Sequence, residues 1–240
     1  MAGALVFAPL LALTGLPSHR ALPMLAASSI IHCAYLSALV RAYGTGDFSL
    51  AYPLARGGGA LLAGLGGALF LDDELGALAW VGVAVVAIGL ASTVRPTTSR
   101  VALGWAGLTA VTIGAYTLID AVGSRRSSSG LAYGFTLFIT AGAAMTVVGV
   151  VSGRGPAFVA ALPRSWWRFV LTGAASNLAY ALVLVAVRRA PVGYVATLRE
   201  SSVVLGALAG WWLLHERLAR ARVVSAMVVV CGMALLIAGR

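Results

Sequence analysis

The stretch SLAYPLARGGGALLAGLGGALFLDDEL, residues 49–75, decides the fold. It is apolar or small nearly throughout, and it is long enough for a helix that crosses a bilayer, which takes roughly 20 residues. Arg56 nevertheless lies inside it. An arginine at the centre of a membrane helix costs about 2.5–3.5 kcal/mol on insertion scales, so such residues usually face a cavity or a partner. The solvent around this segment therefore determines how Arg56 is interpreted.

The composition of the chain identifies that solvent as lipid. Of the 240 residues, 60% are hydrophobic and 10% are charged, and the mean hydropathy is +0.96. Soluble domains carry about 25% charged residues, so this chain cannot build a water-facing surface. All 17 basic residues are arginines, which stand singly or in pairs between apolar runs. This pattern is typical of loops beside lipid headgroups, and we expect a protein that contacts membrane lipids and binds no nucleic acid.

Breaks at proline, glycine and arginine divide the chain into apolar runs. The runs are 3–17, 20–42, 48–71, 76–95, 101–122, 131–152, 167–188, 191–214 and 219–239. Most have the roughly 17–25 residues that a membrane helix needs, and backbone groups in lipid must be satisfied within the segment. The sequence therefore predicts an all-α integral membrane protein of about nine transmembrane helices. The connections, of which 152–165 is the longest, are too short to hold a soluble domain.

An internal repeat relates the two halves of the chain. Residues 32–75 resemble residues 177–218, with Arg56 opposite Arg199 and "LDDEL" opposite "LHERL". The matching runs are five membrane crossings apart, and an odd number of crossings places the two copies in opposite orientations. Inverted repeats around a site near the midplane are a recurrent plan among transporters.

The motifs "GDFSLAYPLARGGGALLAGLGGALFLDDEL" and "ATLRESSVVLGALAGWWLLHERL" resemble the EamA-type transporters of the drug/metabolite transporter superfamily. The resemblance covers nearly the whole chain. It implies two inverted five-helix repeats that move small metabolites, often outward. Residues 1–95 would form the first repeat and residues 101–240 the second, together one membrane domain. The family has ten helices where nine runs are found here, so we expect either a misassigned start or a first repeat that lacks its opening helix.

Three charged residues inside the runs are candidates for substrate binding or coupling. Arg56 either lines a cavity or extends its side chain to the interface, because it lies about two turns into its helix. Arg199 lies eight residues after Pro191, roughly 12 Å along the axis, and Glu200 follows directly. The Arg199–Glu200 pair either is structural or takes part in substrate or proton coupling, the default hypothesis for ionisable residues inside a membrane.

Tyr116 and Asp120 are spaced i,i+4 and share one face of a helix. Asp120 approaches the end of the run 101–122, where Arg125 or Arg126 could pair with it. The two residues therefore belong either to the binding site or to an ion pair at the membrane interface.

A further set of polar residues lies at mid-membrane depth. His32 and Tyr35 are spaced i,i+3, and Asn177 and Tyr180 repeat that spacing in the matched run. Two symmetric polar pairs are what a central site would need. The alternative is hydrogen bonding between helices.

The remaining motifs point to packing and to no cofactor. The glycines of 57–67, with Gly206 and Gly210 in the matched run, are small enough for close helix contact. The same stretch lacks the G-K-[ST] ending of a nucleotide loop. The three histidines are far apart, and Cys33 and Cys231 lie inside apolar runs, so we expect no metal, no cofactor and no disulfide framework.

Together with the resemblance, which implies small metabolites and outward movement, these observations predict a secondary transporter that exports small organic metabolites or drugs by alternating access. We expect a multi-pass protein of the cell membrane, in a bacterium the inner membrane. The sequence leaves open whether the protein forms a homodimer. Two alternatives remain. One is a truncated membrane protein or partner subunit that transports nothing; the other is a membrane-embedded enzyme, although no G-x-S-x-G or H-E-x-x-H motif occurs.

Overall fold

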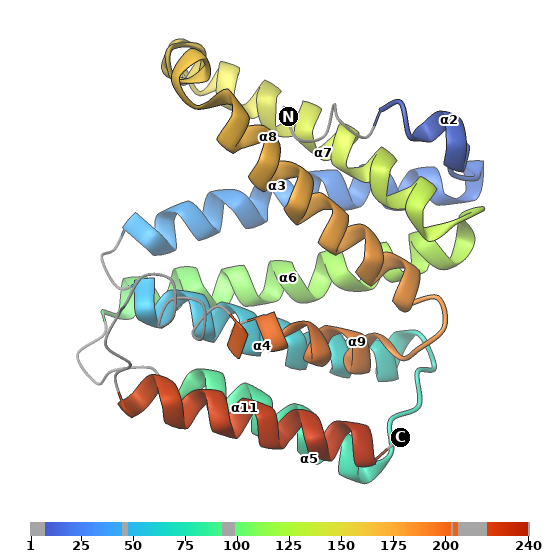
Figure 1. Cartoon of the computed structure of the whole chain (residues 1–240), viewed down its shortest axis with the longest axis vertical. Helices are drawn as coiled ribbons and strands as arrows, with labels where there is room; N and C mark the ends of the chain where they lie inside the picture. Colours follow the sequence, from blue (N-terminus) through green and yellow to red (C-terminus); the bar gives the residue numbers. More distant parts are fainter. Residues whose placement is uncertain (1–7, 45–47, 93–98, 203, 206–219, 240) are drawn as a thin grey trace. The chain divides into compact units, whose positions relative to one another are not determined.

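The computed structural model describes residues 8–44, 48–92, 99–202, 204–205 and 220–239, and every regular element in these ranges is a helix (Figure 1). The elements are α2 (Leu11–Thr14), the 3₁₀ helix η1 (His19–Ala21), α3 (Leu22–Gly44), α4 (Phe48–Phe70), α5 (Ala77–Ala91), α6 (Arg100–Arg126), α7 (Gly130–Val151), α8 (Gly155–Ala186), α9 (Val192–Arg199) and α11 (Arg220–Ala238). The predicted all-α fold is therefore confirmed. The helices form two compact units: the first comprises Met1–Ala34 and Ile119–Arg189, and the second Tyr35–Leu118 and Ala190–Arg240.

Several helices have the length and composition of membrane spans. In the described ranges, the helical segments that are long and apolar enough to cross a membrane are His19–Gly44, Arg100–Arg126, Gly130–Val151 and Trp166–Ala186. Shorter apolar helices cover Leu54–Phe70, Ala77–Ala91 and Val224–Ala238. The chain is a multi-pass membrane protein.

The packing of these helices has the pattern expected in lipid. Large apolar side chains point outward: Ile88, Val147 and Leu171 are all more than 60% exposed, whereas Ala102 and Thr109 are fully buried. In water, large apolar residues fill the core. In lipid they gain nothing by leaving the hydrocarbon, and small residues between helices let the backbones approach closely.

In the first unit, α7 and α8 lie side by side (Figure 1). The segment that leads into α3 packs against them, and the buried residues Ala21, Leu25, Tyr133, Leu137 and Leu184 form one core cluster. Tyr133 is the largest fully buried side chain of this cluster. Its hydroxyl needs a polar partner inside the unit, because an unpaired buried hydroxyl is costly.

The C-terminal end of α6 is held by residues that follow α8. Arg188 donates to the carbonyl oxygens of Ser124 and Ser127, and the Arg125 Nε donates to the Val187 carbonyl oxygen at 2.8 Å. The last carbonyl groups of a helix have no partner within the helix, and a positive charge suits that end of the helix dipole. Arg188 therefore caps the end of α6, and Arg125 in turn satisfies a carbonyl group at the end of α8.

In the second unit, α5 and α11 run antiparallel with their backbones in contact (Figure 1). A Cβ atom added to Gly82 would lie 2.6 Å from the Gly232 carbonyl oxygen, and one added to Gly232 would lie 2.9 Å from the Gly82 carbonyl oxygen. Further along, Gly89 faces Val228, and the Ser225 hydroxyl donates to the Gly89 carbonyl oxygen at 2.6 Å. Glycine is needed at the crossing because any side chain would push the two helices apart.

A second glycine crossing joins α4 to α9. A Cβ atom added to Gly193 would lie 2.7 Å from the Gly64 Cα. α9 begins after Pro191, and the Val192 N–H donates to the Asp73 Oδ2 at 2.7 Å. The first N–H groups of a helix lack partners within it, so Asp73, in the connection after α4, caps α9 and fixes where it starts.

The other glycines of α4 also pack closely, as predicted. A Cβ atom added to Gly57 would lie 3.1 Å from the Leu90 Cβ of α5, and one added to Gly58 would lie 3.0 Å from the Ala110 Cβ of α6. The remaining two glycines of that prediction, Gly206 and Gly210, lie outside the described residues.

Most predicted runs coincide with one helix. The runs 20–42, 48–71, 76–95, 101–122, 131–152 and 219–239 correspond to α3, α4, α5, α6, α7 and α11. The run 3–17 differs: from residue 8 onward it contains only the short helix α2. Gly15, with φ of +74°, and Pro17 end that helix.

The segment 152–165, predicted as a connection, is helical from Gly155 onward, so that prediction was wrong. Pro156 suits a helix start, where its missing N–H is not needed. The helix also continues through Pro163, although an interior proline costs about 3 kcal/mol. In a membrane protein, a non-helical segment at this point would leave several backbone N–H and C=O groups without partners. The proline removes only one hydrogen bond of the helix.

Candidate functional site

The antiparallel crossing of α4 and α9 brings Arg56 beside Glu200. Gly64 faces Gly193 at the crossing. Arg56 lies about two turns before Gly64 in α4, and Glu200 about two turns after Gly193 in α9. Two helices that run in opposite directions bring these positions level with each other. The sequence thus fixes the pairing through the glycine register.

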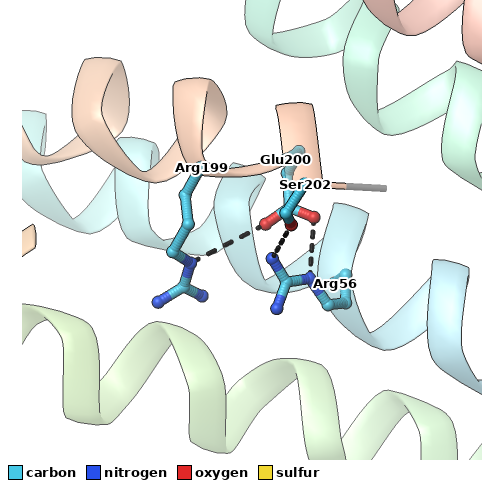
Figure 2. Close-up of polar contacts among 4 residues, drawn as sticks. All are labelled: Arg56, Arg199, Glu200 and Ser202. Atoms are coloured by element: carbon cyan, nitrogen blue, oxygen red, sulfur yellow. Dashed lines mark hydrogen bonds and ion pairs between the residues drawn. The ribbon is translucent and has the colours of Figure 1, made fainter. Parts of the chain in front are cut away.

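Arg56, Arg199, Glu200 and Ser202 form the arginine cluster (Figure 2). The Arg56 Nε donates to the Glu200 Oε2 at 2.8 Å, and the Arg56 Nη2 donates to the Ser202 hydroxyl at 3.3 Å. The Arg199 Nε lies 3.9 Å from the Glu200 Oε1. In Figure 2 the Glu200 carboxylate lies directly above the Arg56 guanidinium, and the Arg199 guanidinium lies to the left of Arg56.

Burial differs between the charges of the cluster. The Glu200 side chain is fully buried, whereas the side chains of Arg56 and Arg199 are 20% and 18% exposed. Glu200 Oε1 and the hydroxyl of the buried Thr197 have no hydrogen-bond partner among the residues that the structure describes. Buried polar atoms without partners are rare. The cluster therefore joins a sequestered carboxylate to two more accessible cations and holds unused hydrogen-bonding capacity.

The helix predicted over 191–214 is interrupted at one residue of its described part, Glu200, which corrects the prediction there; residues 203 and 206–214 lie outside the described residues. α9 ends at Arg199, and Glu200 lies in a turn in which its N–H donates to the Thr197 carbonyl oxygen at 3.0 Å. This i→i−3 bond is tighter than the α-helical i→i−4 bond. An apolar run carries no signal for such a local change. Glu200 itself keeps right-handed helical φ and ψ, and helix resumes at residue 201, so the interruption is one tightened turn.

Two tyrosines adjoin the arginine cluster. Tyr35 of α3 packs edge-on against Tyr116 of α6, with ring centroids 5.5 Å apart and planes at 68°. Tyr35 is close enough to Arg56 and Arg199 for both charges to act on its phenol. Four of the predicted site residues therefore gather in the second unit around Glu200.

A separate group of polar residues surrounds Asp120 in the first unit. Asp120 is fully buried, with its Oδ1 accepting from the Tyr133 hydroxyl at 2.9 Å and its Oδ2 from the Tyr180 hydroxyl at 2.7 Å. The alternative of an ion pair with Arg125 or Arg126 is wrong. Asp120 lies inside α6, which continues to Arg126, and the hydroxyl donors of the unit core take both carboxylate oxygens.

His32 belongs to this Asp120 cluster, which comprises Asp120, Tyr133, Tyr180, Ser28 and His32. The His32 Nδ1 donates to the Ser28 carbonyl oxygen at 2.9 Å, and the His32 ring stands edge-on to Tyr180 at 6.2 Å. The Ser28 hydroxyl is within hydrogen-bonding reach of both His32 and Asp120. His32 is thus linked to the carboxylate through a serine. The predicted partner of His32 on α3, Tyr35, adjoins the arginine cluster instead.

Eight of the nine predicted residues lie in or beside one of the two clusters, and Asn177 is the exception. The Asn177 side chain is half-buried, and it makes no hydrogen bond within the described part of the chain. Sequence reasoning missed Ser28, Tyr133 and Ser202. A signal existed for Tyr133, because a tyrosine in the middle of an apolar run must find a partner for its hydroxyl. Short serines in such a run give no comparable signal.

The two clusters present different polar groups to a ligand. In the described ranges, no three His, Cys, Asp or Glu side chains are grouped as a metal site requires. The arginine cluster offers guanidinium donors suited to planar anions. The Asp120 cluster offers a buried carboxylate surrounded by hydroxyl donors.

Comparison with known proteins gives a family for the chain. Residues 100–238, more than half of the chain, match the sequence model described as the EamA-like transporter family. The matched segment begins at the first residue of α6 and includes α7, α8, α9 and α11. No curated protein matches the chain.

Proposed function

Since the chain belongs to the EamA-like transporter family, we propose that it is a secondary carrier that exports a small organic metabolite or drug across the cell membrane by alternating access. The membrane in question would be the inner membrane of a bacterium. A gradient would supply the energy. A membrane-embedded enzyme fits this family less well, because the family is one of transporters.

The observation that carries the proposal is the arginine cluster. A fully buried glutamate and two arginines lie where α9 is interrupted. Ionisable residues inside membranes are expensive and mark substrate or ion pathways. Interrupted helices with polar groups at the break are the usual construction of a transporter site. Arg56, Arg199 and Glu200 would bind substrate or couple its movement, with Tyr35 and Tyr116 lining the same side.

The packing of matched helices supports the inverted repeat. The segments related by the repeat, α4 with α9 and α5 with α11, each run antiparallel against their own counterpart. A pseudo-twofold axis in the membrane plane would produce such pairs. The first repeat would comprise 1–95 and the second 101–240, and rocking of one against the other would expose the site to each side in turn.

Transport by the purified chain in reconstituted vesicles tests the proposal. Vesicles loaded with pooled labelled metabolites, amino acids among them, are assayed for release with wild type, Arg199→Ala and Arg168→Gln. Arg168 is an exposed arginine of α8 whose guanidinium lies 5.2 Å from the Trp167 ring centroid, so it serves as a matched control outside both clusters. We expect release by wild type and the control, and a loss in Arg199→Ala.

Two results would count against it. Release that Arg199→Ala leaves unchanged, in protein that still folds, would remove the arginine cluster from the mechanism. No release of any pooled compound, even from a widened pool, would favour a membrane protein that transports nothing or a partner subunit. Repeating the assay after collapse of the proton gradient then tests coupling to protons.

A further inference from the structure

The geometry of the arginine cluster points to a substrate that carries a carboxylate, which takes the place of Glu200 on Arg56. This inference rests on the proposed function and adds the chemical class of the substrate. In the empty carrier, Glu200 then occupies the position on Arg56 that the substrate carboxylate would take. The substrate displaces Glu200 when it binds.

One edge of the Arg56 guanidinium bonds two different acceptors. A guanidinium binds a carboxylate most strongly when two N–H groups along one edge donate parallel hydrogen bonds to its two oxygens. The Nε and Nη2 of Arg56 form such an edge, but it is divided between two acceptors: one oxygen of Glu200 at 2.8 Å and the Ser202 hydroxyl at 3.3 Å. A substrate carboxylate would place both of its oxygens on that edge. It would replace a hydroxyl contact with a charge-assisted bond, which is roughly twice as strong as a neutral one.

The charged side chains of the arginine cluster differ in their exposure. The two guanidinium groups are each about one-fifth exposed, whereas the carboxylate of Glu200 is not exposed at all. A ligand that approaches the cluster therefore meets positive charge first. Of the ionisable residues in the cluster, two are cationic and one is anionic, so the cluster as a whole favours an anion. A cationic ligand would have to pass both arginines to reach Glu200.

Glu200 lies on the turn after α9 and uses its two carboxylate oxygens unequally. Its Oε1 lies 3.9 Å from the Arg199 Nε, beyond hydrogen-bonding distance, and accepts no hydrogen bond among the described residues. Only one of its two oxygens is thus fully used. When a substrate carboxylate displaces Glu200 from Arg56, this second oxygen can close the gap to Arg199, so Glu200 is not left without a charged partner.

The test uses small monocarboxylates from acetate to phenylacetate as probes, each beside its amide of the same shape. Their effect on the thermal unfolding midpoint of the detergent-solubilised protein is followed by tryptophan fluorescence, because a ligand stabilises the state that it binds. Chloride at equal ionic strength controls for salt. We expect at least one carboxylate to raise the midpoint where its amide does not, in wild type and in Arg168→Gln alike.

Two variants separate this mechanism from simple charge attraction. Glu200→Gln removes the internal competitor, and a lost charge-assisted bond of about 1.5–3 kcal/mol corresponds to roughly 10- to 100-fold tighter carboxylate binding. Arg56→Lys keeps the charge but removes the two-pronged edge, so it should lose the preference for carboxylate over amide. This second variant decides the question where Glu200→Gln does not fold.

The inference is overturned where no carboxylate exceeds its amide, where Arg56→Lys keeps the preference, or where Glu200→Gln binds carboxylate more weakly than wild type. Its failure is distinct from failure of the proposed function. Release of neutral or cationic metabolites in the vesicle assay, with no preference for carboxylates here, would keep the carrier and remove the substrate class.

Discussion

Arg56→Gln should destabilise the protein more than Arg199→Gln, although both residues face the same carboxylate. The Arg56 Nε donates to Glu200 at 2.8 Å, whereas the Arg199 Nε stands 3.9 Å away. At an effective dielectric constant of about 20, Coulomb's law gives about 6 kcal/mol at 2.8 Å and about 4 kcal/mol at 3.9 Å, before desolvation is deducted. Glu200 is fully buried, and removing the partner of a buried ion costs about 3–5 kcal/mol. We expect a loss in that range for Arg56→Gln and on the order of 1 kcal/mol for Arg199→Gln, whose contact lacks a hydrogen bond.

The free energy of unfolding can be measured in mixed micelles of sodium dodecyl sulfate and a non-ionic detergent, with tryptophan fluorescence as the signal. The double variant Arg56→Gln/Glu200→Gln should lose less than the sum of its single variants, with a coupling energy of about 0.5–3 kcal/mol. Arg168→Gln serves as the control and should change stability by no more than about 0.5 kcal/mol. Equal losses for Arg56→Gln and Arg199→Gln, or strict additivity in the double variant, would refute the assignment of Arg56 as the main partner of Glu200.

Three further predictions concern packing and hydrogen bonds, and the same unfolding measurement checks them. Gly82→Val should cost more than about 3 kcal/mol, because the new side chain would meet the backbone of α11, whereas Gly104→Ala, with no neighbour within 4 Å, should be harmless; similar effects at both sites would contradict the close crossing. Tyr133→Phe should cost about 1.5–3 kcal/mol, since it leaves an oxygen of the buried Asp120 without its donor, and a neutral result would show that the bond does not matter. Asp73→Ala should cost about 0.5–2 kcal/mol through loss of the α9 cap, with Asp73→Asn losing less because it retains an acceptor oxygen.

The sequence was sufficient to predict the helices, because length and apolarity fix a membrane helix with little help from its neighbours. The runs 48–71 and 101–122 needed no tertiary information for this reason. The failures occur where local backbone chemistry matters more than composition. Pro163 predicts a break in a helix, yet α8 continues through it. The apolar stretch after Pro191 predicts one helix, yet that helix is interrupted at Glu200.

The candidate site was predicted only in part. Arg56, Arg199 and Glu200 could be chosen because charges inside apolar runs are conspicuous. The expected pairing of Arg199 with Glu200 is present at 3.9 Å, but nothing in the sequence indicated that Arg56 is the hydrogen-bonded partner of Glu200. Neighbouring residues in a helix point about 100° apart, since the helix has 3.6 residues per turn. Glu200 therefore faces α4 more directly than Arg199 does, and only the crossing at Gly64 reveals that Arg56 lies there.

The position of the ion pair bears on how an empty and a loaded carrier would differ. The Arg56–Glu200 bond joins α4 to the turn after α9, two segments that the proposed inverted repeat assigns to opposite halves. Rocking of the halves would have to stretch this bond and leave a buried carboxylate without its partner, at about 3–5 kcal/mol. On a transition state, that amount slows the movement by roughly 10²- to 10⁴-fold. A substrate carboxylate on Arg56 would already have released Glu200 toward Arg199, so the loaded carrier would move without this barrier. The same contact that stabilises the resting fold would thus suppress futile cycling of the empty carrier.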